Sequence, residues 1–167
     1  MALARLTLVC WLVVNGAVAQ AAPRIQVTRG EGTARITLYD SLCDEDNALE
    51  CLIAEIGCDQ PGDFTATVFD LQSKDAATIF SKSNGKASVM AGGANFVLQV
   101  SRVALSEYTF NWNVTATSLE KGGEIWAAIR GTNEVHLQAG ARKALLRRGD
   151  VGEDAYRAVV GICGAAP

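Results

Sequence analysis

The segment YTFNWNVTAT, residues 108–117, decides the fold class of this chain. Apolar side chains occupy every even position, and threonine or asparagine occupies every odd position. Successive side chains of a β-strand point to opposite faces of the sheet, so this alternation is typical of a strand with one buried and one solvated face. The segment therefore predicts an antiparallel sheet protein.

The flanking sequence repeats the pattern in other segments. Residues 24–29 and 34–40 alternate on either side of the turn signal Gly30-Glu31-Gly32 and predict a β-hairpin. Further strands are expected at residues 63–68, 77–81, 87–90, 95–105, 124–130 and 134–138. No helical pattern separates the central strands, which disfavours parallel βαβ units. We expect a mainly β fold, either an antiparallel β-sandwich or a curled, barrel-like sheet.

Helices are predicted near both ends of the chain. An apolar stripe at helical spacing predicts one N-terminal helix over residues 44–56. Its members are Ala48, Leu49, Leu52, Ile53 and Ile56. Residues 139–148 and 153–162 predict one or two short C-terminal helices.

Residues 1–21 have the layout of a secretory signal peptide. Arg5 precedes an almost wholly apolar run over residues 6–14, and two A-x-A patterns follow within residues 17–21. The apolar run is too short for a membrane-spanning helix, which needs about 20 residues. We therefore expect residues 1–21 to be cleaved, the chain to be exported to the periplasm or secreted, and residues 22–167 to form one domain.

Four cysteines remain after cleavage, and their number predicts two disulfides in an exported chain. They are Cys43, Cys51, Cys58 and Cys163. All three connectivities are open. The spacing lacks the C-x2-C pairs of a zinc site, so no metal and no other cofactor is predicted.

The charge balance limits the class of partner. Cleavage removes one charged residue, Arg5, which leaves 14 basic and 18 acidic side chains and a net charge of −4. Nucleic acid is disfavoured as a partner, because phosphate binding requires a basic surface. Eight of the acids lie in residues 40–63 without any lysine or arginine. Calcium is one interpretation of this stretch, although the order of EF-hand ligands is missing, and a solvated helix start is the other.

Catalytic signals are weak. His136 is the only histidine, and its strand places it on the polar face with Glu134 and Gln138. No G-x-S-x-G motif accompanies it, and no pair of carboxylates stands out as a glycosidase site. We predict no catalytic residue.

The candidate interaction residues are a basic cluster and one tryptophan. The cluster consists of Arg142, Lys143, Arg147 and Arg148. It is interpreted either as a docking patch for an anionic surface or as the solvated end of a helix. Trp126 is expected to be partly exposed, because Ile125, Ala127 and Ile129 offer an alternative inward face.

Asn113-Val114-Thr115 is an N-glycosylation sequon, which matters only in a eukaryotic host.

The C-terminal run VHLQAGARKALL…YRAVVGIC combines a strand, a helix and a terminal cysteine over residues 135–163. It resembles the close of small bacterial periplasmic domains of the invasion-associated locus B type. The resemblance includes no diagnostic motif, so neither fold nor function is carried over from it.

These features predict a secreted or periplasmic, non-enzymatic binding module that contacts a protein or a cell-envelope polymer. Inhibition of a hydrolase is one such role. Two alternatives stay open: a hydrolase that acts on envelope material, and a structural or assembly factor that pairs through a sheet edge.

Overall fold

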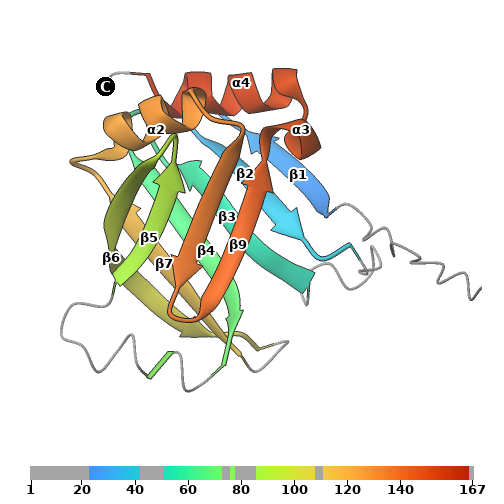
Figure 1. Ribbon diagram of the computed structural model, residues 1–167, viewed down its shortest axis with the longest axis vertical. Helices are drawn as coiled ribbons and strands as arrows, with labels where there is room; N and C mark the ends of the chain where they lie inside the picture. The colour runs from blue at the N-terminus through green and yellow to red at the C-terminus, as the bar shows by residue number, and fades with distance from the viewer. Residues whose placement is uncertain (1–22, 42–50, 73–75, 78–85, 108–110, 166–167) are drawn as a thin grey trace, which may run out of the picture.

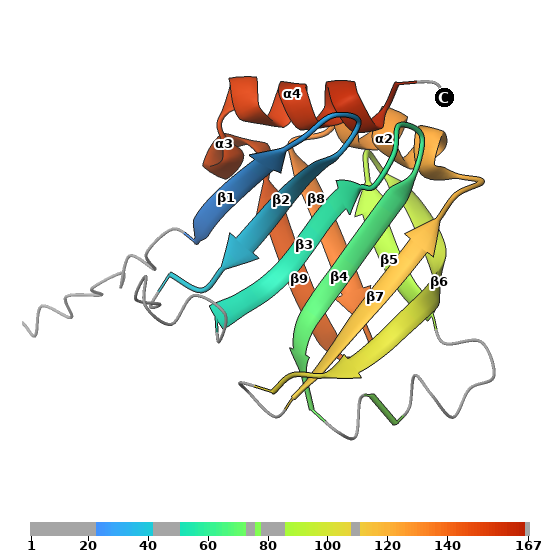
Figure 2. The same cartoon turned by 180° about the vertical axis from the view of Figure 1, so that it is seen from behind.

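The computed structural model describes residues 23–41, 51–72, 76–77, 86–107 and 111–165, and all structural statements concern these residues. They form the nine strands and three helices of Figures 1 and 2. The strands are β1 (Arg24–Arg29), β2 (Ala34–Tyr39), β3 (Leu52–Cys58), β4 (Phe64–Leu71), β5 (Lys86–Ala91), β6 (Ala94–Leu105), β7 (Trp112–Ser118), β8 (Glu134–Ala139) and β9 (Arg142–Arg147). The helices are α2 (Gly122–Arg130), α3 (Arg148–Val151) and α4 (Glu153–Cys163). The predicted mainly β fold is confirmed.

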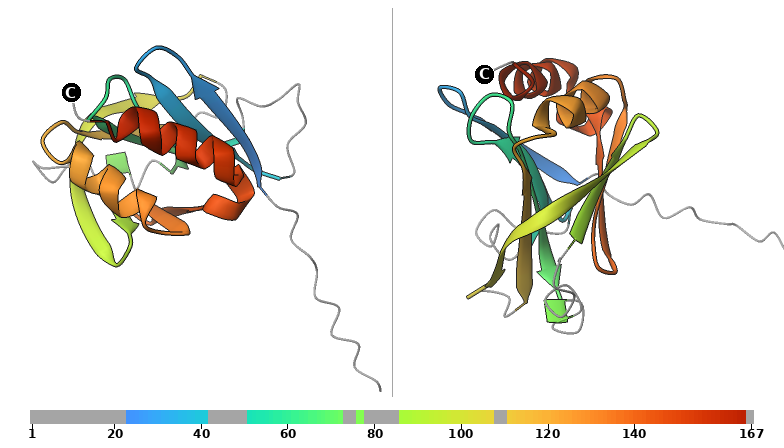
Figure 3. Two further views of the ribbon diagram at one scale, coloured as in Figure 1. Left: turned by 90° about the horizontal axis from the view of Figure 1, so that it is seen from above. Right: turned by 90° about the vertical axis from the view of Figure 1, so that its left-hand side faces the viewer.

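The strands form one sheet in the order β1-β2-β3-β4-β7-β6-β5-β8-β9. Every neighbouring pair is antiparallel. The sheet curls into a half-barrel, so that β4 contacts β8 and β9 across the interior. Of the two expected architectures, the curled sheet is observed and the sandwich is not. Helices α2 and α4 lie side by side across one end of the curl (Figure 3), and with α3 we call them the helical cap.

Several expected strands are confirmed. Strands β1 and β2 form the predicted hairpin. In β7, Val114 and Ala116 are buried, whereas Asn113 and Thr115 on the other face are half-buried. Strands β5 and β6 meet in a two-residue turn at Gly92 and Gly93, whose φ angles of 58° and 83° favour glycine.

The predicted helix over residues 44–56 is wrong from Leu52 onward, because strand β3 begins there. Ala54, Ile56 and Cys58 point into the core at period two, while β2 and β4 pair with the strand on both sides. Ile53 is only half-buried on the opposite face of the strand. Its apolar side chain fits the three- and four-residue spacing of a helix, and this coincidence led to the wrong prediction. Residues 44–50 lie outside the described residues.

Two C-terminal assignments are exchanged. Residues 124–130, expected as a strand, belong to helix α2, and Ile125, Trp126 and Ile129 form its buried face. Residues 142–147, expected as helical, form strand β9, with Ala144 and Leu146 buried. The turn before β9 directs this segment into the sheet. Gly140 adopts a φ of 59°, so the chain reverses and β9 pairs with β8. The helix expected over residues 153–162 is confirmed as α4.

The turn between β3 and β4, residues 59–63, joins the sheet to the helical cap. The backbone N–H of Gly62 donates to the Cys163 carbonyl at 2.8 Å, and the indole Nε1 of Trp126 donates to the Asp63 carbonyl at 2.6 Å. A Cβ atom on Gly122 would lie 1.9 Å from the Gly62 oxygen, so only glycine fits where α2 meets this turn.

A disulfide fastens the same joint. Cys58 at the end of β3 is bonded to Cys163 at the end of α4, and both residues are fully buried. Cys51 is also disulfide-bonded, and its partner lies outside the described residues. This chemistry is compatible with an oxidising, extracytoplasmic compartment.

Residues 1–22 lie outside the described residues, so cleavage stays a prediction. In the described ranges, no helix is long and apolar enough to cross a membrane.

Candidate functional site

The four residues of the predicted basic cluster do not form one patch. Lys143 and Arg147 point outward from β9, whereas Arg142 points to the other face of that strand. Arg142 Nη2 lies 3.6 Å from Asp70 Oδ2, and Arg147 Nε lies 3.2 Å from Glu134 Oε1. Arg148 begins α3 and belongs to the helical cap. The shared helical face expected for Lys143 and Arg147 becomes a shared face of a strand.

The expected exposure of Trp126 is wrong. Its side chain is fully buried in α2, where its ring meets Phe64 edge-to-face with centroids 5.2 Å apart. The strand interpretation placed Trp126 opposite Ile125, whereas on a helix these neighbours share one apolar face. Trp126 has no accessible surface and therefore cannot contact a partner in this structure.

A pocket of about 260 Å³ lies on the helical cap, and we call it the arginine pocket. It collects side chains from the end of α2, the start of α3 and the middle of α4. Its lining residues are Arg130, Arg148, Tyr156, Arg157, Val160 and Gly161. Three arginines thus contribute to the lining of one small cavity in a molecule that is acidic overall.

One carboxylate organises two of these arginines. Glu153 accepts hydrogen bonds from Arg148 Nε at 2.6 Å and Arg148 Nη2 at 2.5 Å, and it also pairs with Arg157. The hydrogen bonds from Arg148, assisted by Arg157, lower the pKa of Glu153 to about 2, so it stays ionised. Arg130 makes no ion pair with any described residue. The described lining of the pocket contains these three arginines and no acid. The same helices also carry Glu124, Asp150, Glu153 and Asp154.

Tyr156 forms an inert wall of the arginine pocket. Its hydroxyl donates to the Ile129 carbonyl at 2.7 Å, and burial raises its pKa to about 12. The Arg148 guanidinium stacks over its ring, 5.2 Å from the centroid, in a cation–π contact. The ring therefore helps to hold Arg148 in place.

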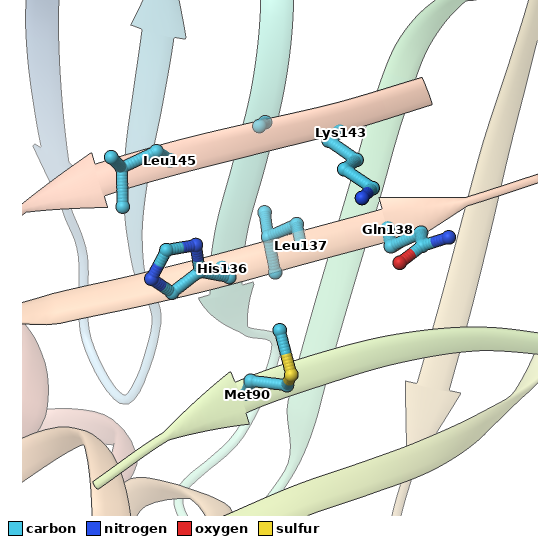
Figure 4. Close-up of a pocket in the computed structure, with 7 residues that line it drawn as sticks. Met90, His136, Leu137, Gln138, Lys143 and Leu145 are labelled. Atoms are coloured by element: carbon cyan, nitrogen blue, oxygen red, sulfur yellow. The ribbon is translucent and has the colours of Figure 1, made fainter. Parts of the chain in front are cut away.

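His136 lies where the sequence placed it, on the outer face of β8 with Glu134 and Gln138. It borders a shallow depression of about 200 Å³, in which Figure 4 shows side chains from β5, β8 and β9. The depression is lined by Met90, His136, Leu137, Gln138, Lys143, Ala144 and Leu145. None of the described lining residues carries a hydroxyl or thiol that His136 could activate, so these residues form no nucleophile–histidine pair.

The acidic stretch is divided by the fold. Glu55 and Asp59 both pair with Arg35, which holds them on the outer surface of β2 and β3. In the part of the chain that the structure describes, no group of three metal-ligating side chains comes together. The densest acidic run, residues 44–47, lies outside it.

A polar cluster at the end of β4 connects the two halves of the curl. Asp70 sits at a bulge with a φ of 62°, and its Oδ1 accepts from Asn111 Nδ2 at 2.6 Å. Asn113 Oδ1 accepts from the Asp70 backbone N–H at 3.4 Å, and Arg142 approaches from β9. Asn113 of the glycosylation sequon is thus half-buried and engaged in this contact.

Sequence reasoning found one of the three pocket arginines, Arg148, and missed Arg130 and Arg157. Arg130 ends a helix that was interpreted as a strand, and Arg157 lies on an exposed face of α4. The helical spacing of Glu153 and Arg157, four residues apart, is a signal for Arg157. It gives no indication of Arg130, which lies on a different helix.

No protein-family model, no curated protein and no solved structure matches this chain.

Proposed function

We propose that this chain is an exported, non-enzymatic binding module that holds an anionic group of a protein or cell-envelope polymer in the arginine pocket. The observation that supports the proposal is the convergence of Arg130, Arg148 and Arg157 on one cavity. Guanidinium groups stay charged at any relevant pH and donate paired hydrogen bonds that match phosphate and carboxylate oxygens.

The surrounding contacts suit such a role. Glu153 and Tyr156 hold Arg148 in place before a ligand arrives, which reduces the entropy lost on binding. Arg130 supplies a guanidinium group without an acidic partner among the described residues. A pocket of about 260 Å³ accommodates a phosphate or a side-chain carboxylate rather than a large ligand.

The test is an NMR titration with inorganic phosphate and, separately, with a short poly-glutamate peptide. Each hydrogen bond to a charged group contributes about 1.5–3 kcal/mol, so the double variant Arg130→Gln, Arg157→Gln should weaken binding at least tenfold. Arg102→Gln, an exposed arginine of β6, is the matched control and should bind like the unmodified protein. Equal affinity in the double variant and the control contradicts the proposal.

The two probes also separate the ligand classes. Preference for phosphate supports a phosphorylated polymer or headgroup, and preference for the peptide supports an acidic protein. The affinity of either should fall as salt is raised, because the contacts are electrostatic and partly exposed.

A further inference from the structure

Strand β9 is an open edge of the sheet. In the described part of the chain it pairs with β8 on one side and with no strand on the other. The pairing with β8 is regular over all six residues, from Arg142 to Arg147, without a bulge. The strand contains no proline. Bulges and prolines are backbone devices that block an edge, and β9 has neither. Within the described residues, no strand pairs with the outer side of β9.

Among the described strands, none closes this edge. In an antiparallel sheet the direction alternates from strand to strand, so the first and the ninth strands run the same way. Strands β1 and β9 therefore cannot pair with each other in antiparallel fashion, although α3 contacts both. An additional strand beside β9 would continue the antiparallel order.

The side chains of β9 restrict which strand fits. Lys143, Leu145 and Arg147 point outward, with Leu145 half-buried between two exposed cations. Arg147 forms a surface ion pair with Glu134, and such exposed pairs contribute little to stability. The edge carries three basic residues and no acid.

A second copy of this chain is a poor occupant. Pairing β9 with another β9 sets cations against cations, and like charges directly opposite each other destabilise a sheet. The other edge strand, β1, likewise contains two arginines and no acid. The positive charge of β9 disfavours pairing with a second copy and favours pairing with an acidic strand.

We propose that the β9 edge binds an extended acidic segment of another protein by β-augmentation. Side chains opposite Lys143 and Arg147 would be aspartate or glutamate, and the side chain opposite Leu145 would be apolar. The recognised pattern is acidic-x-apolar-x-acidic. Leu145 also lines the depression of Figure 4, so the apolar residue meets a surface that continues toward Met90. This inference goes beyond the proposed function, since it concerns a different surface.

The experiment uses synthetic nine-residue peptides and the full folded domain. The test peptide carries a central Glu-Val-Val-Val-Glu, and a matched peptide replaces both glutamates with lysine. A third peptide keeps the glutamates but is N-methylated at alternate amides, which removes its backbone donors. Binding is measured by fluorescence anisotropy, and amide hydrogen exchange locates the site.

The glutamate peptide should bind and increase the protection of β9 amides. Each cross-strand charge pair contributes a modest amount, so the lysine peptide should bind about 2- to 30-fold more weakly. The variant Lys143→Glu, Arg147→Glu should reverse this preference, which shows directly that the variant folds and binds. Arg102→Gln, an exposed arginine of β6 that belongs to neither surface, is the matched control and should leave peptide binding unchanged. Protection of the β9 amides separates this test from that of the arginine pocket, which lies on the helical cap.

Three results would overturn the inference. The first is no binding of the glutamate peptide. The second is equal binding of the N-methylated peptide, since that indicates charge attraction without strand pairing. The third is protection that appears elsewhere while the β9 amides stay unprotected.

Discussion

Replacing Gly122 by alanine should destabilise the domain, whereas the same change at Gly123 should not. A Cβ atom at position 122 would lie 1.9 Å from the Gly62 oxygen and 2.8 Å from the Asp63 carbonyl carbon, both of them backbone atoms. Relief requires α2 to move away from the β3–β4 turn by more than an ångström. The Trp126 hydrogen bond to Asp63, now 2.6 Å long, would then be stretched or lost.

The magnitude follows from these two contributions. Overpacking in a closely packed site costs about 1–3 kcal/mol, and a lost internal hydrogen bond costs about 1 kcal/mol more. Gly122→Ala should therefore lower the free energy of unfolding by about 2–4 kcal/mol. At Gly123 a Cβ meets nothing within 4 Å, so Gly123→Ala should raise stability by about 0.4–1 kcal/mol through the unfolded chain.

The assay is urea denaturation followed by tryptophan fluorescence, with both variants and the unmodified protein measured under the same conditions. The two substitutions add the same methyl group to adjacent residues of one helix, so differences in helix propensity largely cancel. A loss below 0.5 kcal/mol for Gly122→Ala, or equal losses at both positions, refutes the close contact at the joint.

Three further predictions concern the same joint and the helical cap. The double variant Cys58→Ala, Cys163→Ala should lose about 4–5 kcal/mol in denaturant unfolding, because the bridge closes a loop of 105 residues; a loss below 1 kcal/mol would contradict the assigned role of the bridge. Trp126→Phe should cost about 1–3 kcal/mol, since it leaves the Asp63 carbonyl without its donor, and thermal unfolding indistinguishable from the parent protein would count against this bond. The pKa of Glu153 is lowered from 4.5 to about 2, so its contribution is fully present above pH 4.5 and is lost as the pH falls toward 2. In Glu153→Gln the melting temperature should vary less across that pH window, and an unchanged pH profile would show that the carboxylate does not interact with Arg148.

The alternating segments predicted the sheet because, in a strand with one buried face, apolar and polar residues alternate along the sequence. Val114 and Ala116 are buried while Asn113 and Thr115 are not, and this difference is local to one strand. The curl of the sheet and the pairing of β5 with β8 depend on contacts between distant segments. Contacts between distant segments produce no periodic pattern of apolar residues, so they cannot be predicted from a single sequence.

The exchanged assignments have a common cause. In helix α2, Ile125, Ala127 and Ile129 alternate by composition, although Ala127 is exposed and Trp126 is buried. In β9, the charged residues that suggested a helix end belong to an open strand edge. A short segment can match both the two-residue period of a strand and the roughly 3.6-residue period of a helix. Tertiary packing, rather than local preference, then determines which structure it forms.

The candidate site was predicted only in part for the same reason. Arg148 was identified within a run of basic residues, but Arg142, Lys143 and Arg147 lie on a different element. The arginine pocket arises where three helices meet, and no stretch of sequence brings Arg130 and Arg157 together.

The long interval between Cys58 and Cys163 has a consequence for biosynthesis. A chain made from its N-terminus displays Cys58 for about 5–20 s before Cys163 exists, since 105 residues separate them. Cys51 is nearby throughout that time, and any early bond between Cys51 and Cys58 must be undone by thiol–disulfide exchange. The bond that locks the cap onto the sheet is therefore a late product, and the yield of correctly paired protein should depend on a catalyst that shuffles thiols.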